Sequence, residues 1–326
     1  MIEVKHLSKH FKVYKRKSGA FGALRSLFKP EYETVKALDD VSFDIGSGEI
    51  VGYIGPHGAG KSTTVKILSG ILVPDGGDVR VNGLVPWKER KSHVANIGVV
   101  FGQRSQLWWD VPVSDSYELL RDIYRIPEDR YLRTSSMLIE LLDLGKLLSV
   151  PVRQLSLGQR VRCEIAASLL HEPDILFLDE PTIGLDAVSK LAVRKFIKEI
   201  NRERGVTVIL TTHDTGDIEA LAKRILLIGK GKILYDGGFG ELKGRFRGTR
   251  TLRIHFEGER CEIPGSRGIL ESKVLENQAE ILFNPDEISA SDLITYISGM
   301  FRITDLEIEN IEAEEIIAGL YKEYRI

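Results

Sequence analysis

The hydrophobic positions of this chain of 326 residues follow two patterns that alternate along the sequence. Short runs of continuous apolar residues, which are typical of strands buried in a parallel sheet, occupy 49–54, 97–101, 175–178 and 206–210. Between them, apolar residues recur at helical spacing in 65–71, through most of 112–148, and in 161–170 and 188–202. Strands that alternate with helices predict a doubly wound α/β sheet, with a helical block inserted at about 104–172.

The N-terminal part of the chain is predicted to contain shorter strands at 2–4 and 41–45, and a hairpin-like segment at 78–83. Between the first two strands lies a basic insertion, residues 12–34. Its apolar residues recur at helix-like spacing: Phe21, Leu24, Leu27 and Phe28. Two interpretations remain open, a basic amphipathic helix that touches a membrane face or a partner protein, and a solvated, partly disordered loop.

The composition changes near residue 240, where Gly, Lys and Arg predominate. We expect a first domain at 1–240, a linker at 241–248 and a small α+β domain at 249–326. In that domain, strands are expected at 251–256, 280–283 and 306–311, and helices at 289–300 and 313–324.

The charge balance is nearly neutral, with 45 basic and 47 acidic residues, which predicts no general attraction to nucleic acid. The two cysteines, Cys163 and Cys261, are far apart in the sequence and fit a reducing cytoplasm rather than a disulfide-built secreted protein. No apolar run approaches the roughly 20 residues that cross a bilayer, and the N-terminus lacks an apolar signal region. We therefore expect a soluble chain whose membrane role, if it has one, depends on a partner.

Residues 55–63 match G-x-x-x-x-G-K-[ST], the phosphate-binding P-loop pattern. In order they are Gly55, Pro56, His57, Gly58, Ala59, Gly60, Lys61, Ser62 and Thr63. An apolar strand precedes this loop and a helical pattern follows it, which is the context that the motif requires. The glycines let the backbone wrap phosphate oxygens, and the helix N-terminus supplies partial positive charge. Lys61 is expected to reach the β- and γ-phosphates, and the Ser62 hydroxyl is expected to ligate Mg²⁺.

Further candidate residues stand at the ends of the other predicted strands. The apolar run 175–178 ends in Asp179, which we expect to hold Mg²⁺, and Glu180, which is placed to orient or deprotonate the attacking water. Gln103 follows the strand 97–101 as a candidate for the Mg²⁺ shell or the lytic water. His213 follows the strand 206–210 as a candidate donor to the γ-phosphate.

The segment Leu155-Ser156-Leu157-Gly158-Gln159-Arg160 resembles the signature of ATP-binding cassette (ABC) ATPases. The order of motifs is also that of this family, from the P-loop through Gln103 and the signature to Asp179-Glu180 and His213. The resemblance covers residues 1 to about 240. It implies a P-loop cassette with a mixed sheet core, an inserted helical subdomain and an antiparallel β subdomain.

The resemblance also implies roles for residues that spacing alone does not assign. Two cassettes, a homodimer or a pair, are expected to clamp ATP and Mg²⁺ head to tail, so that Ser156, Gly158 and Gln159 contact the ATP of the other subunit. Asp186 is expected at the dimer seam, and Gln103 beside the surface that meets the membrane subunit. The adenine-stacking aromatic is expected to be Phe11 or Tyr14.

Leu157 departs from the pattern, because a glycine usually stands there, and His57 takes a P-loop place where Asn or Ser is common. The region around Trp108 and Trp109 is similar to bacterial exporters of the ABC-2 group, related to drug- and polysaccharide-export cassettes. These tryptophans either receive a permease helix or pack inside the helical block. The resemblance implies an exporter motor on the inner face of the cell membrane, bound to permease subunits. The alternatives are a soluble ABC ATPase that acts on ribosomes or DNA and a binding module that does not hydrolyse ATP.

Overall fold

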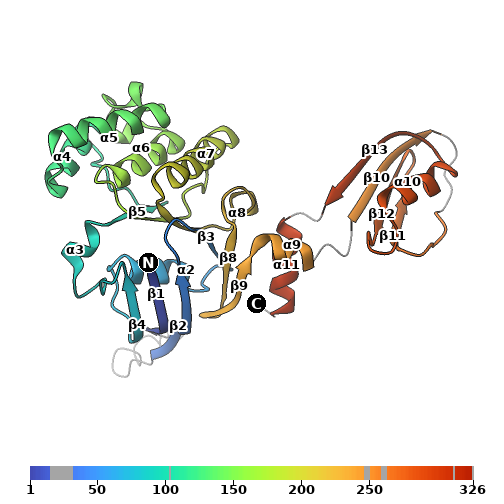
Figure 1. Cartoon of the computed structure of the whole chain (residues 1–326), viewed down its shortest axis with the longest axis horizontal. Helices are drawn as coiled ribbons and strands as arrows, with labels where there is room; N and C mark the ends of the chain where they lie inside the picture. The colour runs from blue at the N-terminus through green and yellow to red at the C-terminus, as the bar shows by residue number, and fades with distance from the viewer. Residues whose placement is uncertain (15–31, 103, 246–249, 258–262, 311–312, 325–326) are drawn as a thin grey trace, which may run out of the picture. The chain divides into compact units, whose positions relative to one another are not determined.

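The computed structural model of the chain describes residues 1–14, 32–102, 104–245, 250–257, 263–310 and 313–324. These residues form two compact units, Met1–Asp236 and Gly237–Ile326 (Figure 1). None of their helices is both long enough and apolar enough to cross a membrane.

The first unit is built on a six-stranded sheet with the strand order β5-β6-β7-β3-β8-β9. Its strands are β3 (Ile50–Ile54), β5 (Ile97–Phe101), β6 (Ile175–Asp179), β7 (Thr207–Thr211), β8 (Arg224–Gly229) and β9 (Lys232–Gly238). The neighbours from β5 to β8 in this order pair in parallel. The predicted apolar strands are confirmed, because buried parallel strands need apolar side chains on both faces. The same edge of the sheet therefore collects the residues that follow β3, β5, β6 and β7.

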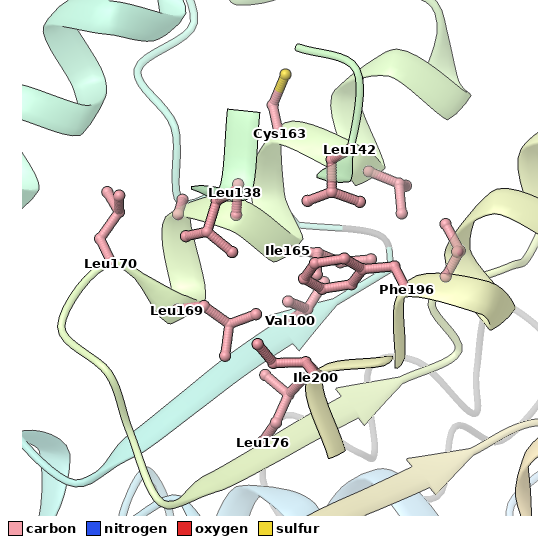
Figure 2. Packing of buried hydrophobic residues seen from close by; sticks show 14 of the residues in the cluster. Val100, Leu138, Leu142, Cys163, Ile165, Leu169, Leu170, Leu176, Phe196 and Ile200 are labelled. Atoms are coloured by element: carbon pink, nitrogen blue, oxygen red, sulfur yellow. The ribbon is translucent and has the colours of Figure 1, made fainter. Parts of the chain in front are cut away.

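One face of this sheet is covered by α6 (Leu157–Leu169), α7 (Ala187–Arg204) and the helical block. The block contains α4 (Val113–Tyr124), α5 (Glu128–Leu141) and the 3₁₀ turns Gly145–Leu147 and Val152–Gln154. Figure 2 shows Val100 and Leu176 of the sheet packed in one cluster with Leu169 of α6 and Phe196 of α7. The predicted helical block is thus confirmed, and α6 begins four residues before the expected start at 161.

The other face packs on α2 (Lys61–Leu68) and on a three-stranded antiparallel sheet with the order β2-β1-β4. This sheet consists of β1 (Ile2–Tyr14), β2 (Tyr32–Ile45) and β4 (Gly76–Val81). Two short helices complete the unit, α3 (Arg90–Val94) and α8 (Thr215–Leu221).

Of three N-terminal expectations, two were wrong in detail. The ends of the insertion predicted at 12–34 are strand residues, since Lys12 pairs with Thr34 and Tyr14 with Tyr32; residues 15–31 lie outside the described part. The hairpin-like segment predicted at 78–83 is confirmed, because the chain turns back at Asn82 and Gly83 and Val81 forms an antiparallel bridge with Leu84; β4 also pairs with β1. Ile71 was expected on the buried face of the helix, but it lies beyond the end of α2 and is 48% exposed. The apolar pattern did not indicate the turn that ends the helix before it.

The second unit contains a four-stranded sheet with the order β11-β12-β10-β13. Its elements are β10 (Arg250–Glu257), β11 (Ile269–Val274), β12 (Gln278–Phe283), β13 (Arg302–Asn310), α9 (Phe239–Arg245), α10 (Ala290–Ser298) and α11 (Ala313–Glu323). An apolar cluster between α10 and the sheet includes Ile254, Phe283 and Leu293. The linker expected at 241–248 is instead helical as far as Arg245, and Leu242 is fully buried. The Gly and Lys content of this segment suggested a linker, but the segment contains most of a seven-residue helix with a buried leucine.

Candidate active site

The P-loop connects the end of β3 to the start of α2, and its lysine folds back over it. The Lys61 ammonium group donates hydrogen bonds to the carbonyl oxygens of Gly55 at 2.6 Å and Pro56 at 3.1 Å. The residue is only 6% exposed. Burial lowers the pKa of Lys61, and the nearby carboxylates of Glu180 and Asp179 oppose that shift. A buried cation with two negative neighbours is thus fixed in the loop.

The backbone of the loop needs glycine at two positions. Gly60 has a φ of 115°, and a Cβ atom there would lie 2.5 Å from the carbonyl oxygen of Ala37. Gly58 has a φ of 77°, but a Cβ atom there would meet nothing within 4 Å. The loop encloses a cavity of about 180 Å³. It is lined by Ala37, by the P-loop residues His57, Gly58, Ala59, Gly60, Lys61, Ser62 and Thr63, and by Glu180. This cavity, with glycines and a lysine at a helix N-terminus, has the chemistry of a phosphate site.

Ser62 and Asp179 lie side by side next to this cavity. The Ser62 hydroxyl donates to a carboxylate oxygen of Asp179 at 3.2 Å, and the Thr211 hydroxyl donates to the same oxygen at 2.5 Å. A hydroxyl and a carboxylate beside a phosphate cavity are oxygen ligands of the kind that Mg²⁺ takes together with phosphate oxygens and water. The residues therefore fit Mg²⁺. Among the described residues, no cluster of three or more His, Cys, Asp or Glu could hold a metal ion.

Two histidines lie close to Glu180: His57 lines the phosphate cavity with Glu180, and His213 lines a separate cavity of about 60 Å³ that Glu180 also borders. The Nδ1 atom of His213 lies 3.5 Å from a carboxylate oxygen of Glu180. The ring of His57 meets the ring of His213 edge to face, with 5.8 Å between the centroids. The backbone of Glu180 has a φ of 56°, which is unusual for a residue with a side chain. The Glu180 N–H donates to the carbonyl oxygen of Thr211 at 3.0 Å and to the hydroxyl oxygen of Thr211 at 3.1 Å.

The signature residues stand at the N-terminus of α6. The Ser156 hydroxyl accepts from the Gln159 N–H at 3.2 Å, and the Gln159 side chain accepts from the Ser156 N–H at 2.9 Å. A Cβ atom at Gly158 would lie 2.5 Å from the Ser189 hydroxyl, so this position admits little more than glycine. Asp186 caps α7 by accepting from the Ser189 N–H at 2.9 Å. Within one subunit, these residues therefore make the turns at the starts of α6 and α7.

Other predicted residues lie away from the phosphate cavity or outside the described part. Gln103 is outside it, although its neighbours Gly102 and Arg104 line a second cavity of about 390 Å³ that also includes Asp179 and Glu180. Phe11 lies on β1, 37% exposed, and does not line either cavity. The side chain of Tyr14 is outside the described part.

Trp108 and Trp109 are 41% and 50% exposed, so neither is packed inside the helical block. The Arg160 guanidinium stands 5.7 Å from the ring of Trp109. This contact connects the segment that follows Gln103 with the signature helix.

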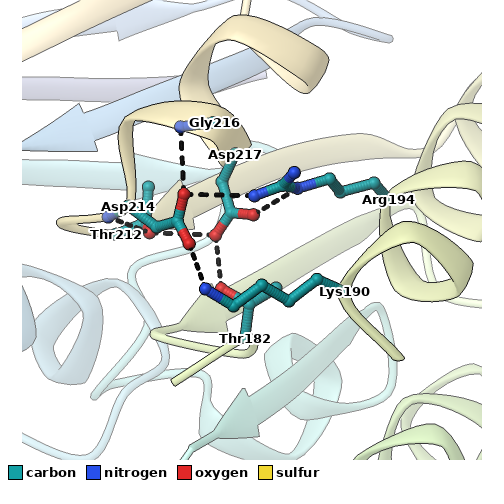
Figure 3. Close-up of polar contacts among 7 residues, drawn as sticks. All are labelled: Thr182, Lys190, Arg194, Thr212, Asp214, Gly216 and Asp217. Carbon is teal, nitrogen blue, oxygen red and sulfur yellow. Dashed lines mark hydrogen bonds and ion pairs between the residues drawn. The ribbon is translucent and has the colours of Figure 1, made fainter. Parts of the chain in front are cut away.

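A group of charged residues beside the site was not found by sequence reasoning. Asp214 and Asp217 on the N-terminal turn of α8 contact Lys190 and Arg194 on α7 (Figure 3). The available signal was the spacing of Lys190 and Arg194, which puts both on one face of a helix, and the position of Asp214 directly after His213.

The comparisons agree with this geometry. Residues 38–183 match the ABC transporter family. The chain is 32% identical to "Daunorubicin resistance ATP-binding protein DrrA3" of Streptomyces coeruleorubidus, over 87% of this chain and 88% of that protein. It is 30% identical to "Linearmycin resistance ATP-binding protein LnrL" of Bacillus subtilis (strain 168), over 71% of this chain and 73% of that protein.

Among solved structures, the chain resembles the ATP-binding cassette MJ0796 in a dimeric post-hydrolysis state bound to ADP and Pi, with a TM-score of 0.61 and 26% identity. That match covers 73% of this chain and 98% of the cassette. The chain therefore belongs to the ABC transporter family, as an ATP-binding protein with the ABC-type α/β cassette fold. It is an ATPase of this family and similar to the drug-resistance group of ABC ATP-binding proteins.

Proposed function

We propose that this chain is the ATP-hydrolysing motor of a bacterial ABC-2-type membrane exporter. The observation that carries the proposal is that Glu180 lines the phosphate cavity and His213 contacts its carboxylate. The relatives of the chain include ATP-binding proteins named for daunorubicin and linearmycin resistance. The site holds a cation for phosphate, a carboxylate for water and a donor for the γ-phosphate. Such a set favours hydrolysis over nucleotide binding alone.

ATP is the substrate, and its phosphates lie in the P-loop cavity under the backbone N–H groups and Lys61. Ser62 and Asp179, with Gln103, would hold Mg²⁺, which supplies positive charge against the phosphate oxygens when bound. Glu180 orients a water molecule and accepts its proton as the water oxygen bonds to the γ-phosphorus and the bond from that phosphorus to the β-phosphate oxygen breaks. His213 donates a hydrogen bond to the γ-phosphate. Positioning and fixed charge supply most of the rate in such transfers.

The second half of the site comes from another copy of the chain or a paired cassette. Ser156 is exposed at the start of α6, and Asp186 is exposed at the start of α7. We assign Ser156, Gly158 and Gln159 to the ATP held by the partner P-loop, and Asp186 to the seam between the subunits. The N-terminus of α6 offers partial positive charge to that triphosphate. The dimeric state of MJ0796 with ADP and Pi supports this arrangement.

The cargo path belongs to separate permease chains. The exposed Trp108 and Trp109, which follow Gln103 closely in the sequence, offer an aromatic surface, and exposed apolar surfaces of this kind mark protein contacts. We assign this surface to a permease segment and place the chain at the inner face of the cell membrane. Adenine stacking is assigned to Phe11 or Tyr14.

Affinity purification of the tagged, full-length chain from detergent-solubilised native membranes tests this function. The expected result is co-purification of multi-span membrane proteins, which is reduced when Trp108 and Trp109 are both replaced by Ala. Recovery of ribosomes or DNA instead, without membrane proteins, would support the alternative of a soluble ABC ATPase and overturn the exporter assignment.

A further inference from the structure

We propose that Asp217 is a positioning residue that fixes the distance between Glu180 and His213. Asp217 is fully buried on the first turn of α8 and lines neither the phosphate cavity nor the second cavity of about 390 Å³. A buried carboxylate is costly unless its oxygens accept hydrogen bonds. Its partners therefore show what the carboxylate holds in place. This inference rests on the proposed hydrolytic roles of Glu180 and His213.

Two partners of Asp217 come from the loops that carry these residues, and a third comes from α7 (Figure 3). One carboxylate oxygen accepts from the hydroxyls of Thr182, in a short hydrogen bond, and Thr212, at 3.0 Å. The other accepts from Nε of Arg194 at 2.6 Å. Thr182 stands two residues after Glu180, and Thr212 directly precedes His213. A single oxygen thus joins the loop of the proposed base to the loop of the proposed γ-phosphate donor.

The charges around Asp217 are balanced without the nucleotide. Arg194 also contacts Asp214 through Nη2 at 3.1 Å, and Lys190 forms a short ion pair with Asp214. Asp214 accepts from the Gly216 N–H at 2.9 Å, and its own N–H donates to the Thr212 hydroxyl at 3.0 Å. Two carboxylates and two cations form a closed network, so ATP binding is not needed to satisfy it. This network is suited to hold the positions of the residues that take part in it.

The backbone conformation of Glu180 is an independent reason to expect that the hydrogen bonds of Asp217 hold this loop in place. Its φ of 56° lies in the left-handed region, which costs energy for a residue with a side chain. Such a conformation persists when its surroundings determine it. Thr211 holds the Glu180 N–H, and Asp217 holds Thr182 on the other side. The turn that aims the carboxylate is therefore held from both directions.

Paired substitutions of Thr182 and Thr212 distinguish the effect of losing the hydroxyl from the effect of changing the shape of the side chain. Thr212→Val and Thr182→Val keep the branched shape and remove the donor, whereas Thr212→Ser and Thr182→Ser keep the donor. We expect kcat for ATP to fall at least about ten-fold in each Val variant, because a hydrogen bond to a charged group is lost. The KM for ATP should change less than about two-fold, because the P-loop is untouched. The Ser variants should restore most of kcat.

Thr134→Val is the matched control. The Thr134 hydroxyl donates to the carboxylate of Glu172 at 2.5 Å, and Arg130 donates to the same carboxylate at 2.6 Å. Thr134, Arg130 and Glu172 thus also pair a threonine hydroxyl and an arginine with one carboxylate. They belong to the helical block and line neither the phosphate cavity nor the second cavity. Thr134→Val should lower the melting temperature as the other Val variants do and leave kcat unchanged.

A crystal structure of Thr212→Val without nucleotide gives a readout that does not depend on turnover. The separation of 3.5 Å between Glu180 and His213 should be lost in the Val variant and kept in the Ser variant. Equal separations in both, or equal kcat in the Val and Ser variants, would overturn the positioning role. Absence of ATP hydrolysis by the wild-type chain would instead refute the proposed function, and the crystal structures would still decide the role of Asp217.

Discussion

The Nδ1 atom of His213 lies 3.5 Å from a carboxylate oxygen of Glu180, although the two residues follow different strands of the sheet. Asp179 on β6 pairs with Thr211 on β7, so the residues that follow each strand meet at one edge. The carboxylate and the imidazole can therefore act on the same water and phosphate. This relationship makes the roles of single residues testable.

Replacing Glu180 by Gln should stop turnover and keep nucleotide binding. Gln has nearly the same shape but cannot accept the proton of the attacking water, so kcat should fall at least about 100-fold. The ATP-bound dimer should then persist, which size-exclusion chromatography with light scattering detects. The exposed Glu140 on α5 supplies the control, since Glu140→Gln should retain the wild-type rate. Turnover of Glu180→Gln at the wild-type rate would remove Glu180 from the mechanism.

Ser156→Arg should abolish hydrolysis and leave ATP binding to the monomer intact, because Ser156 is assigned to the partner's nucleotide. This substitution also removes an N-cap, at a cost of about 1 kcal/mol. Ser156→Asp separates the two effects, since Asp caps helices well but places negative charge against the triphosphate. Both variants should fail to dimerise with ATP. Loss of ATP binding by the monomer, measured by calorimetry, would contradict the head-to-tail arrangement.

The glycines of the P-loop should respond unequally to alanine. Gly60→Ala combines a φ of 115° with a Cβ atom 2.5 Å from the Ala37 carbonyl oxygen, so the loop has to shift. Gly58→Ala has a φ of 77° and open space, so its cost should be only the backbone strain of about 1 kcal/mol. In thermal unfolding without nucleotide, the melting temperature should fall more for Gly60→Ala than for Gly58→Ala. Equal melting temperatures for the two variants would mean that the Ala37 contact does not restrain the loop.

Stability should decline in mild acid because of His171. The residue is 8% exposed, stacks on Tyr124 with 4.0 Å between ring centroids, and donates through Nε2 to the Ile97 carbonyl oxygen at 2.9 Å. Burial lowers the pKa of His171 from 6.5 to about 4, and the Ile97 hydrogen bond opposes that shift. The folded pKa lies below the unfolded one, so the contribution is complete above pH 6.5 and is lost as the pH falls toward 4.

Between pH 7 and pH 5 this loss should amount to about 2 kcal/mol. Urea unfolding of the wild type and of His171→Gln at both pH values measures the difference, and the variant should lose correspondingly less. An identical pH dependence in the two proteins would show that His171 is not held neutral by the fold.

The first unit should fold without the second. A chain that ends after Gly238 keeps β9 and should unfold cooperatively and bind ATP. A chain that ends after Gly248 keeps α9 without α11, the helix that it contacts, and leaves buried Leu242 exposed. The longer chain should therefore aggregate more in light scattering at equal concentration. Failure of the shorter chain to fold would place the domain boundary elsewhere.

The sequence by itself determined the class of the fold and most of the phosphate site. The P-loop is a local motif, and its flanking strand and helix are encoded by short-range hydrophobic periodicity, so neither requires knowledge of distant residues. The same holds for the apolar run that ends in Asp179 and Glu180. Periodicity did not locate the end of α2, and it did not indicate α9, because a turn or a short helix adds too few residues to a pattern.

Only the tertiary structure decided which residues meet. Strand pairing brings Thr211 to Asp179, and helix packing brings Arg194 and Lys190 to the carboxylates of α8. These contacts join residues that are distant in the chain, and a buried carboxylate such as that of Asp217 looks like any surface acid until its partners are known. Local pattern therefore specifies each element and its chemistry, whereas the balance of buried charges and hydrogen bonds is a property of the assembled fold.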